Sequence, residues 1–248
     1  MHRFIVQGGL ACGQAVRLSQ EEAAHAARVL RLKTGEAVEL MDGEGRLFAA
    51  ELTEVSRENV LAQIKAELPS RESEIRVTLL QGLPKAEKMD WVVQKATELG
   101  VARIIPVRME RCVVKLDEKD AQRRKERLQR IAAEAAKQCG RARTPVVDAA
   151  MDYARALQEV AGRGLFIMPW EQASGAGLAA LRREIEHPEE IFILIGPEGG
   201  ISQREAVQAM DVGARCVSLG PRILRTETAA IASAAMVMYA WGDLGGTI

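Results

Sequence analysis

The stretch Glu190-Ile-Phe-Ile-Leu-Ile-Gly-Pro-Glu-Gly-Gly200 decides the fold class of this 248-residue chain. The five residues after Glu190, Ile191 to Ile195, form an apolar run, which is typical of a strand buried on both faces of a sheet. Ser202 and Glu205, just behind the glycines, have the S-x-x-E spacing of a capping box and predict a helix start. A strand, a glycine turn and a helix in this order indicate an open α/β sheet, which binds ligands at the ends of its strands.

The turn itself is Gly196-Pro197-Glu198-Gly199-Gly200. Glycines let the backbone come close to a ligand, so a branched side chain at Gly199 is expected to obstruct that approach. A tight connection without any ligand is the alternative interpretation. The turn matches neither the G-x-G-x-x-G nor the G-x-x-x-x-G-K-[ST] pattern, so nicotinamide and ATP sites have little support.

A second loop of the same kind extends from Ser218 to Thr228, with the sequence SLGPRILRTET. It holds Arg222 and Arg225, and Thr226 is the expected N-cap of the last helix. The arginines could instead pair with surface acids while the threonine does no more than cap. Since two such loops follow neighbouring strand ends, we expect them to share one pocket.

The rest of the chain predicts two domains. Residues 1–72 show one early helix and several short strands, which indicates a small β-barrel, and LPSRESE (68–74) breaks this pattern. Residues 73–248 alternate apolar strands with helices, including a long helix at about 118–139 and a last helix from Thr226 to about Trp241. That alternation predicts a mostly parallel sheet of the α/β class.

Basic residues are concentrated in one segment although the whole chain has 34 Lys and Arg against 34 Asp and Glu. Between residues 123 and 143 there are eight basic residues and two acidic ones. A basic helix followed by a basic loop is typical of a surface that binds the phosphates of a nucleic acid. The alternative is that these residues only form a solvated helix face.

Several classes of protein are excluded or left without support. The four cysteines are spread apart with no C-x-x-C, so neither a zinc ribbon nor a disulfide framework is expected. No apolar run is long enough for a signal peptide or a membrane span. We expect a reduced, soluble, cytoplasmic protein with no metal and no membrane partner.

Four segments in order, KMDWVVQKATELGV, QCGRART, GPEGG and VSLGPRILRTETAA, resemble the 16S ribosomal RNA (uracil N3) methyltransferases of the RsmE type. MHRFIV and HAARVLRLKTGE resemble the PUA-like N-terminal part of that family. The resemblance implies a SPOUT-type α/β domain with a deep trefoil knot behind a PUA-like β-barrel. It also implies a homodimer that transfers a methyl group from S-adenosylmethionine to N3 of a uridine in the decoding region of 16S rRNA, in the small ribosomal subunit.

Carried over by motif, the donor pocket is expected from three segments of the second domain. Its residues are Met168, Pro169, Gly196, Pro197, Glu198, Gly199, Gly200, Ser218, Leu219, Gly220, Ile223, Leu224 and Thr226.

For the chemistry, Arg225 is expected to stabilise the uracil anion, and Glu171 and Glu227 are candidate bases. The expected RNA contacts are Arg3, Arg123, Arg124, Arg127, Arg141 and Arg143. A non-catalytic RNA-binding protein, and a knotted methyltransferase that acts on another RNA such as tRNA, remain the alternatives.

Overall fold

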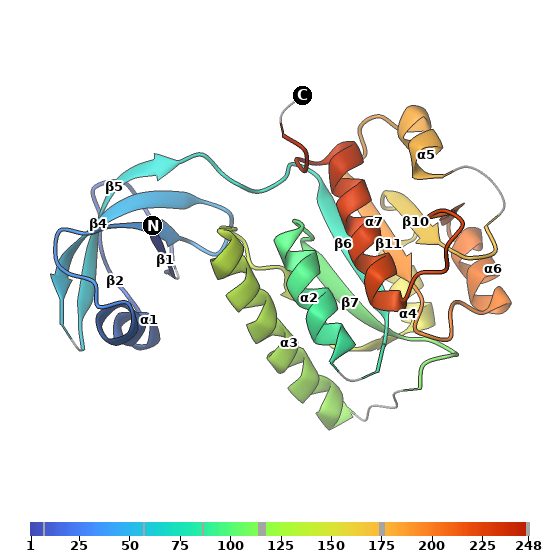
Figure 1. Ribbon diagram of the computed structural model, residues 1–248, viewed down its shortest axis with the longest axis horizontal. Helices are drawn as coiled ribbons and strands as arrows, with labels where there is room; N and C mark the ends of the chain where they lie inside the picture. Colours follow the sequence, from blue (N-terminus) through green and yellow to red (C-terminus); the bar gives the residue numbers. More distant parts are fainter. Residues whose placement is uncertain (7, 57, 86, 114–117, 174–176, 247–248) are drawn as a thin grey trace. The chain divides into compact units, whose positions relative to one another are not determined.

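The chain is described by a computed structural model that covers all residues except 7, 57, 86, 114–117, 174–176 and 247–248 (Figure 1). Two compact units are present. The first comprises Met1–Glu72 and Ala136–Thr144, and the second comprises Ser73–Ala135 and Pro145–Ile248. The sequence predicts that residues 136–144 belong to the second domain, whereas the structure groups them with the first unit.

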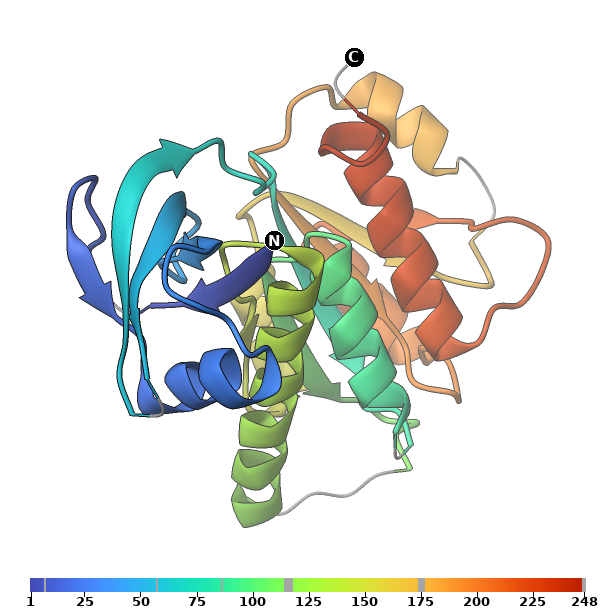
Figure 2. The ribbon, with the colours of Figure 1, turned by 60° about the vertical axis from the view of Figure 1, so that its left-hand side comes forward.

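The first unit is a mixed five-stranded sheet with strand order β1-β3-β4-β5-β2. Figure 2 draws these strands in blue to cyan. Its strands are β1 (His2–Ile5), β2 (Ala15–Arg17), β3 (Ala37–Met41), β4 (Leu47–Val55) and β5 (Val60–Leu68). Strand β1 is parallel to β3, and the other neighbours are antiparallel. The sequence predicts a barrel, but within the described residues no ladder joins β1 to β2, so the sheet is open there.

The helix predicted near Ser19 lies on this sheet. Helix α1 (Gln20–Ala24) begins after Ser19, whose hydroxyl accepts a hydrogen bond from the backbone N–H of Glu22. A π-helical turn, His25–Val29, continues it. Ala23 and Ala26 are buried against the core of the sheet.

The second unit is a sheet of seven strands in which every pairing is parallel. The main order is β12-β10-β11-β6-β7-β8, and β9 also pairs with β7. The strands are β6 (Arg76–Gly82), β7 (Arg103–Arg108), β8 (Val146–Val147), β9 (Met151–Asp152), β10 (Leu165–Pro169), β11 (Glu190–Ile195) and β12 (Arg215–Val217). The α/β class and the mostly parallel sheet predicted from the sequence are confirmed.

Helices cover both faces of this sheet (Figure 1). They are α2 (Lys88–Glu98), α3 (Glu118–Cys139, whose last turn belongs to the first unit), α4 (Tyr153–Val160), α5 (Leu178–Glu184), α6 (Gln203–Asp211) and α7 (Thr226–Trp241). In β11, Ile191 and Ile193 pack with α2, α3, α5 and α7, whereas Phe192 and Leu194 pack with α4 and α6. Burial on both faces explains why this strand shows an unbroken apolar run.

The loops expected to share a pocket do not follow adjacent strands, because β10 lies between β11 and β12. Helix α6 begins with the predicted capping box of Ser202 and Glu205. Helix α7 begins one residue earlier than a Thr226 cap would place it. Arg225 is the N-cap, and the Thr226 hydroxyl donates to a carbonyl outside the helix. Among the described helices, none is both long and apolar enough to cross a bilayer.

Candidate active site

A pocket with a volume of about 460 Å³ lies at the carboxyl ends of β10 and β11 in the second unit. The loop that follows β12 lines it with Ile223, Leu224 and Arg225. Its walls are Lys88, Pro169, Glu171, Ile195, Gly196, Pro197, Glu198, Gly199, Gly200, Ile201, Ile223, Leu224, Arg225, Thr226 and Ala229. Four segments that are far apart in the sequence, at residues 88, 169–171, 195–201 and 223–229, therefore form one cavity.

The glycine turn forms one wall and needs glycine at its last position. The backbone N–H of Gly200 donates to the carbonyl of Pro197 at 2.9 Å, and Gly200 has φ +72°, a left-handed conformation that strains other residues. A Cβ at this position would also lie 2.9 Å from Oε1 of Glu171. The Glu171 carboxylate is therefore packed directly against the turn.

Thr226 joins the turn to helix α7. Its hydroxyl donates to the carbonyl oxygen of Gly196 at 2.6 Å and accepts from the Gln81 amide at 2.9 Å. Thr226 and Gln81 are both buried. The first turn of α7 and the glycine turn are thus held together by a buried hydrogen bond.

Glu198 of the glycine turn takes part in a cluster of charged side chains. Oε1 of Glu198 accepts from the backbone N–H of Lys85 at 3.0 Å and lies 3.1 Å from the Lys88 ammonium, which is 3.4 Å from Glu227. Burial raises the pKa of the Glu198 carboxyl, but the Lys85 N–H and the Lys88 ammonium outweigh it and hold this pKa below its ordinary value. The hydrogen bond from Lys88 to Glu198 raises the pKa of the ammonium in turn. Both groups are therefore charged at neutral pH.

Arg225 and Glu171 differ from those charges, because neither side chain has a hydrogen-bond or ion-pair partner among the described residues. Both are exposed and both line the pocket. Arg225 is oriented by its place at the N-cap of α7, with φ −64° and ψ 153°. The cavity thus presents one unpaired cation and one unpaired anion to whatever enters it.

The predicted donor residues fall into two groups. Pro169, Gly196 to Gly200, Ile223, Leu224 and Thr226 line the pocket. The remaining four, Met168, Ser218, Leu219 and Gly220, are not among its lining residues within the described chain. The side chain of Met168 is fully buried in the core with α4 and α6. Ile223 is 90% exposed at the rim.

The basic segment is divided by the structure. Arg123, Arg124 and Arg127 line a second hollow of about 390 Å³ in the second unit, together with Glu87 and Asp120. Arg127 also forms a bidentate ion pair with Asp90, in which Nη1 donates to Oδ2 and Nη2 donates to Oδ1 at 2.7 Å. These arginines therefore lie beside acidic groups on α2 and α3.

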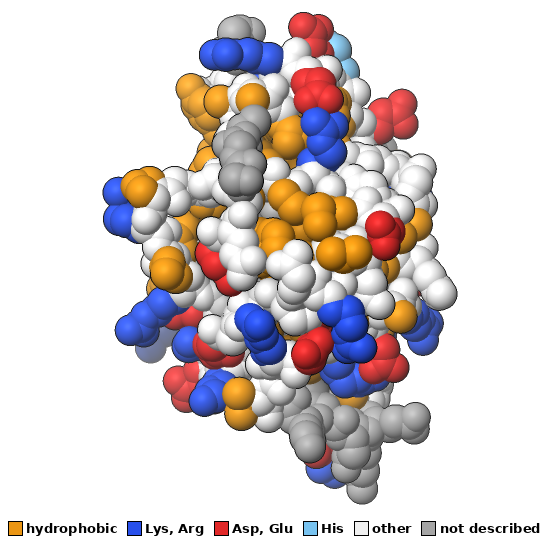
Figure 3. All heavy atoms as spheres, turned by 90° about the vertical axis from the view of Figure 1, so that its right-hand side faces the viewer, with side chains coloured by type: hydrophobic (Ala, Val, Ile, Leu, Met, Phe, Trp, Pro, Cys, Tyr) orange, Lys and Arg blue, Asp and Glu red, His pale blue; other side chains and the backbone are white. Residues whose placement is uncertain are grey.

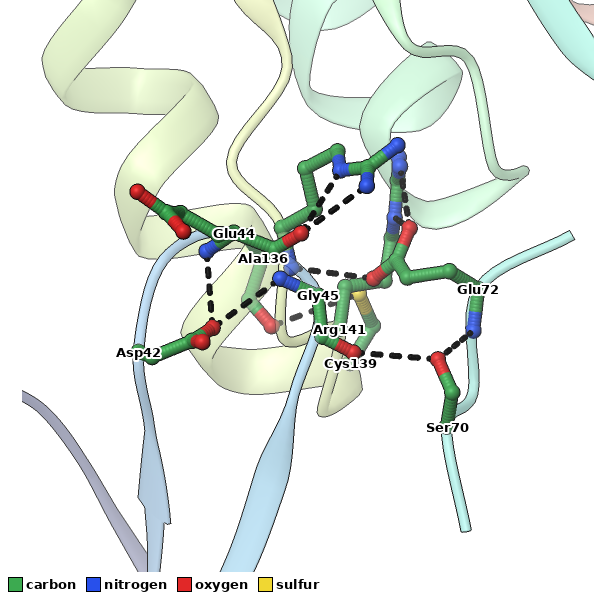
Figure 4. Close-up of polar contacts among 9 residues, drawn as sticks. Asp42, Glu44, Gly45, Ser70, Glu72, Ala136, Cys139 and Arg141 are labelled. Atoms are coloured by element: carbon green, nitrogen blue, oxygen red, sulfur yellow. Dashed lines mark hydrogen bonds and ion pairs between the residues drawn. The ribbon is translucent and has the colours of Figure 1, made fainter. Parts of the chain in front are cut away.

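Arg3, Arg141 and Arg143 make contacts inside the first unit. Arg141 is buried with its Nη2 2.8 Å from Oε2 of Glu72, and Figure 4 shows this ion pair. Arg143 donates from its backbone N–H to Glu72 and from its side chain to the carbonyl of Glu44. Arg3 pairs with the buried carboxylate of Glu39 at 2.8 Å. The positive charge of Arg141 is therefore already neutralised by the protein.

Three residues at or beside the pocket are not predicted from the sequence: Gln81, Lys88 and Arg111. Lys88 lines the pocket, and Nη1 of Arg111 donates to the carbonyl of Gly199 at 3.0 Å. The available signal was position: Gln81 and Lys88 lie at or just after the end of the buried strand β6, whose carboxyl end shares an edge with those of β10 and β11. In the described part of the chain, no three His, Cys, Asp or Glu side chains gather as a metal ion would require.

Gly199→Val is expected to weaken ligand binding in the pocket about tenfold or more, through displacement of the turn. A Cβ at Gly199 would lie 2.8 Å from Cβ of Arg111 and 3.2 Å from its carbonyl oxygen. The Arg111 segment therefore obstructs a side chain at Gly199 and would displace the turn. Titration calorimetry measures the affinity. Gly9→Val is the control, since nothing lies within 4 Å of a Cβ there. Equal affinity for both variants would contradict this account of the turn.

Comparison with known proteins identifies the family. A model of an RNA methyltransferase domain matches residues 71–238, and a model of an RNA methyltransferase PUA domain matches residues 18–65. Ribosomal RNA small subunit methyltransferase E of Bacillus subtilis (strain 168) is 33% identical over 227 residues, which are 90% of this chain and 89% of that protein. The chain belongs to the ribosomal RNA small subunit methyltransferase E family.

Solved structures agree with the methyltransferase E assignment. A ribosomal RNA small subunit methyltransferase E from Neisseria gonorrhoeae, bound to S-adenosyl methionine, is 36% identical with a TM-score of 0.87. The match covers 98% of this chain and 99% of that one. A putative methyltransferase from Legionella pneumophila, in complex with the cofactor SAM, is 34% identical with a TM-score of 0.85 and 98% coverage of both chains. The similarity to the methyltransferase E family thus includes both units.

Proposed function

We propose that this protein transfers a methyl group from S-adenosylmethionine to N3 of a uridine in the decoding region of 16S rRNA, in the small ribosomal subunit in the cytoplasm. The methyltransferase E family gives the class of reaction. The observation that carries the proposal is the pocket at the strand ends, where a glycine turn meets an unpaired Arg225 and an unpaired Glu171.

The residues of the pocket fit this methyl donor. Its volume of about 460 Å³ is in the range of small-molecule sites. Ile195, Ile201, Leu224 and Ala229 offer apolar surface to an adenine, and the turn offers backbone groups to polar edges. The carboxylate of Glu171 is opposite in charge to a sulfonium. When bound, S-adenosylmethionine supplies a methyl group attached to positively charged sulfur.

The protein must also make the uridine reactive. The N3–H of uridine is a weak acid, and its proton has to leave before or while N3 forms a bond to the methyl carbon. Arg225 stays protonated at all relevant pH values, so it serves to stabilise negative charge on the uracil carbonyl oxygens. Glu171 is the candidate that accepts the N3 proton, because its carboxylate lines the same pocket and is unpaired among the described residues.

RNA docking is assigned to Arg123, Arg124 and Arg127. Changing all three to alanine is expected to weaken RNA binding and to lower the slope of log K against log salt by about one for each phosphate that these arginines neutralise. Donor affinity should stay unchanged. Arg215→Ala is the control, because Arg215, like Arg127, is an exposed arginine in an ion pair with an acidic side chain, here Glu184 at 2.7 Å. An unchanged salt slope in the triple variant would mean that these arginines do not contact RNA phosphates and only form a solvated helix face.

A homodimer belongs to the same proposal. Exposed hydrophobic side chains of the second unit include Ile223, Met236 and Tyr239, with Tyr239 72% exposed on α7. Figure 3 shows hydrophobic side chains gathered in the middle of one face of the molecule. Apolar surface of this kind is typical of an interface between subunits. Solution scattering at micromolar concentration should give the mass of a dimer, and the mass of a monomer would defeat this part of the proposal.

The trefoil knot implied by the resemblance is proposed as well. Helix α7 follows the edge strand β12, yet it packs against β6 and β11 near the middle of the sheet and bonds to the turn after β11. This return brings the C-terminal helix over the middle of the sheet, as the threaded C-terminus of such a knot requires, and knots of this kind are rare in proteins.

Titration calorimetry with S-adenosylmethionine separates this enzyme from a non-catalytic RNA-binding protein. The proposal predicts one donor site per chain, which Gly199→Val weakens. RNA binding without any donor binding would favour the non-catalytic alternative. Methylation of tRNA with no methylation of small ribosomal subunits would favour a knotted methyltransferase with another target.

A further inference from the structure

Gln81 lies at the end of β6 and is fully buried, yet it is a polar residue in an apolar strand. Its Nε2 donates to the Thr226 hydroxyl at 2.9 Å and to the carbonyl of Gly82 at 2.9 Å. The Thr226 hydroxyl donates in turn to the carbonyl of Gly196 at 2.6 Å. These bonds form a chain from the core strand, through the first residue of α7, to the glycine turn.

The number of hydrogens on each group decides which group donates in each of these hydrogen bonds. A threonine hydroxyl has one hydrogen, and here it goes to the Gly196 carbonyl, so the oxygen must accept from the amide of Gln81. Both hydrogens of that amide are then used. Its Oε1 is buried with no hydrogen-bond partner in the described chain, which is an unfavourable state for a carbonyl. An aliphatic side chain would avoid this cost, so the contribution of Gln81 lies in what its N–H groups hold.

We propose that Gln81 is a positioning residue of the donor pocket. It does not line the cavity and acts through Thr226, whose hydroxyl it orients toward Gly196. This bond sets the separation between the glycine turn and the start of α7, and Arg225 precedes Thr226 directly. The inference rests on the proposed function, because it names the residue that shapes the same site.

The test compares Gln81→Leu, Thr226→Val and the double variant by calorimetry with S-adenosylmethionine. Each single change should weaken binding roughly tenfold, since each breaks the same buried chain. The double variant should lose about tenfold as well, because a residue that acts through another adds nothing once that partner is gone. Thr226→Ser keeps the hydroxyl and should retain most of the parental affinity.

Thr97→Val is the matched control. Thr97 is also a fully buried threonine whose hydroxyl donates to a backbone carbonyl, that of Val93 at 2.7 Å, but it lies on α2 away from the pocket walls. Its change should leave donor affinity at the parental value. Parental affinity in Gln81→Leu, or a double variant with the roughly hundredfold loss of two independent effects, would overturn the proposal.

Amide hydrogen exchange tests the positioning role of Gln81 without the donor, so its result does not depend on the proposed function. The amide of Gly200 is bonded to Pro197, and the amide of Ala229 is bonded to Arg225. Both should exchange faster in Gln81→Leu than in the parent protein and in Thr97→Val. Parental exchange at these two amides would overturn the positioning role even if the donor binds. Failure of the parent protein to bind the donor would instead overturn the proposed function, and the exchange result would still decide the role of Gln81.

Discussion

Arg225→Ala is expected to lower the rate of methyl transfer about 100-fold or more while fold and donor affinity persist. The loss corresponds to the removal of one group that stabilises charge in the transition state. Arg225 lines the pocket with no partner among the described residues, so its removal leaves no buried charge behind. Single-turnover assays across a range of pH measure the effect. The loss should be largest at low pH and shrink as pH rises, because more of the uridine is then ionised without help.

Two variants sharpen this experiment. Arg225→Lys should recover little activity, because the flat guanidinium that can bind a carbonyl with two N–H groups is absent. Arg222→Ala is the matched control, since Arg222 is another exposed arginine of the same loop but does not line the pocket. A parental transfer rate in Arg225→Ala at every pH would show that Arg225 does not activate the uridine.

Arg141→Met is expected to destabilise the first unit by about 3 kcal/mol or more, because it leaves the Glu72 carboxylate without its partner. The two side chains are only 7% and 10% exposed, and Nη2 and Oε2 are 2.8 Å apart. Glu72 also accepts a hydrogen bond from the backbone N–H of Arg143. Within the first unit, Glu72 therefore holds residues 136–144 to residues 1–72 (Figure 4). Urea unfolding followed by circular dichroism measures the change in free energy.

Lys65→Met is the control within the same unit. Lys65 pairs with Glu51 at 3.1 Å, but these side chains are 53% and 46% exposed, and exposed pairs contribute at most about 1 kcal/mol. Replacing both Arg141 and Glu72 by apolar residues should restore part of the stability that Arg141→Met removes. Equal destabilisation in Arg141→Met and Lys65→Met would mean that the buried pair does not hold this segment.

Much of the second unit could be predicted from the sequence, because its strands are unbroken apolar runs and its helices carry clear end signals. The capping box at Ser202 and the extent of α7 to Trp241 are examples. The order of the strands could not be predicted in the same way. It depends on which strands pair across long separations, such as β6 with β11 and β10 with β12. No local pattern encodes those pairings.

The function of charged residues was harder to predict than the fold. The basic segment looks uniform in the sequence, but Arg141 is buried against Glu72, while Arg123 and Arg127 line an open hollow. Two of the acidic partners, Glu72 of Arg141 and Asp90 of Arg127, lie far away in the sequence, so no spacing rule reveals them. Gln81 was missed for a similar reason, because its partner Thr226 is 145 positions away.

Methyl transfer to 16S rRNA can be measured on small ribosomal subunits isolated from a strain that lacks the gene. The subunits are incubated with the purified protein and S-adenosylmethionine, and the 16S rRNA is then mapped by mass and by reverse transcription. We expect one methyl group per 16S rRNA, on a uridine in the decoding region. Because N3 lies on the base-pairing edge, that methyl group should stop reverse transcription at this position. Unmethylated 16S rRNA, or a methyl group that leaves reverse transcription unaffected, would contradict the account.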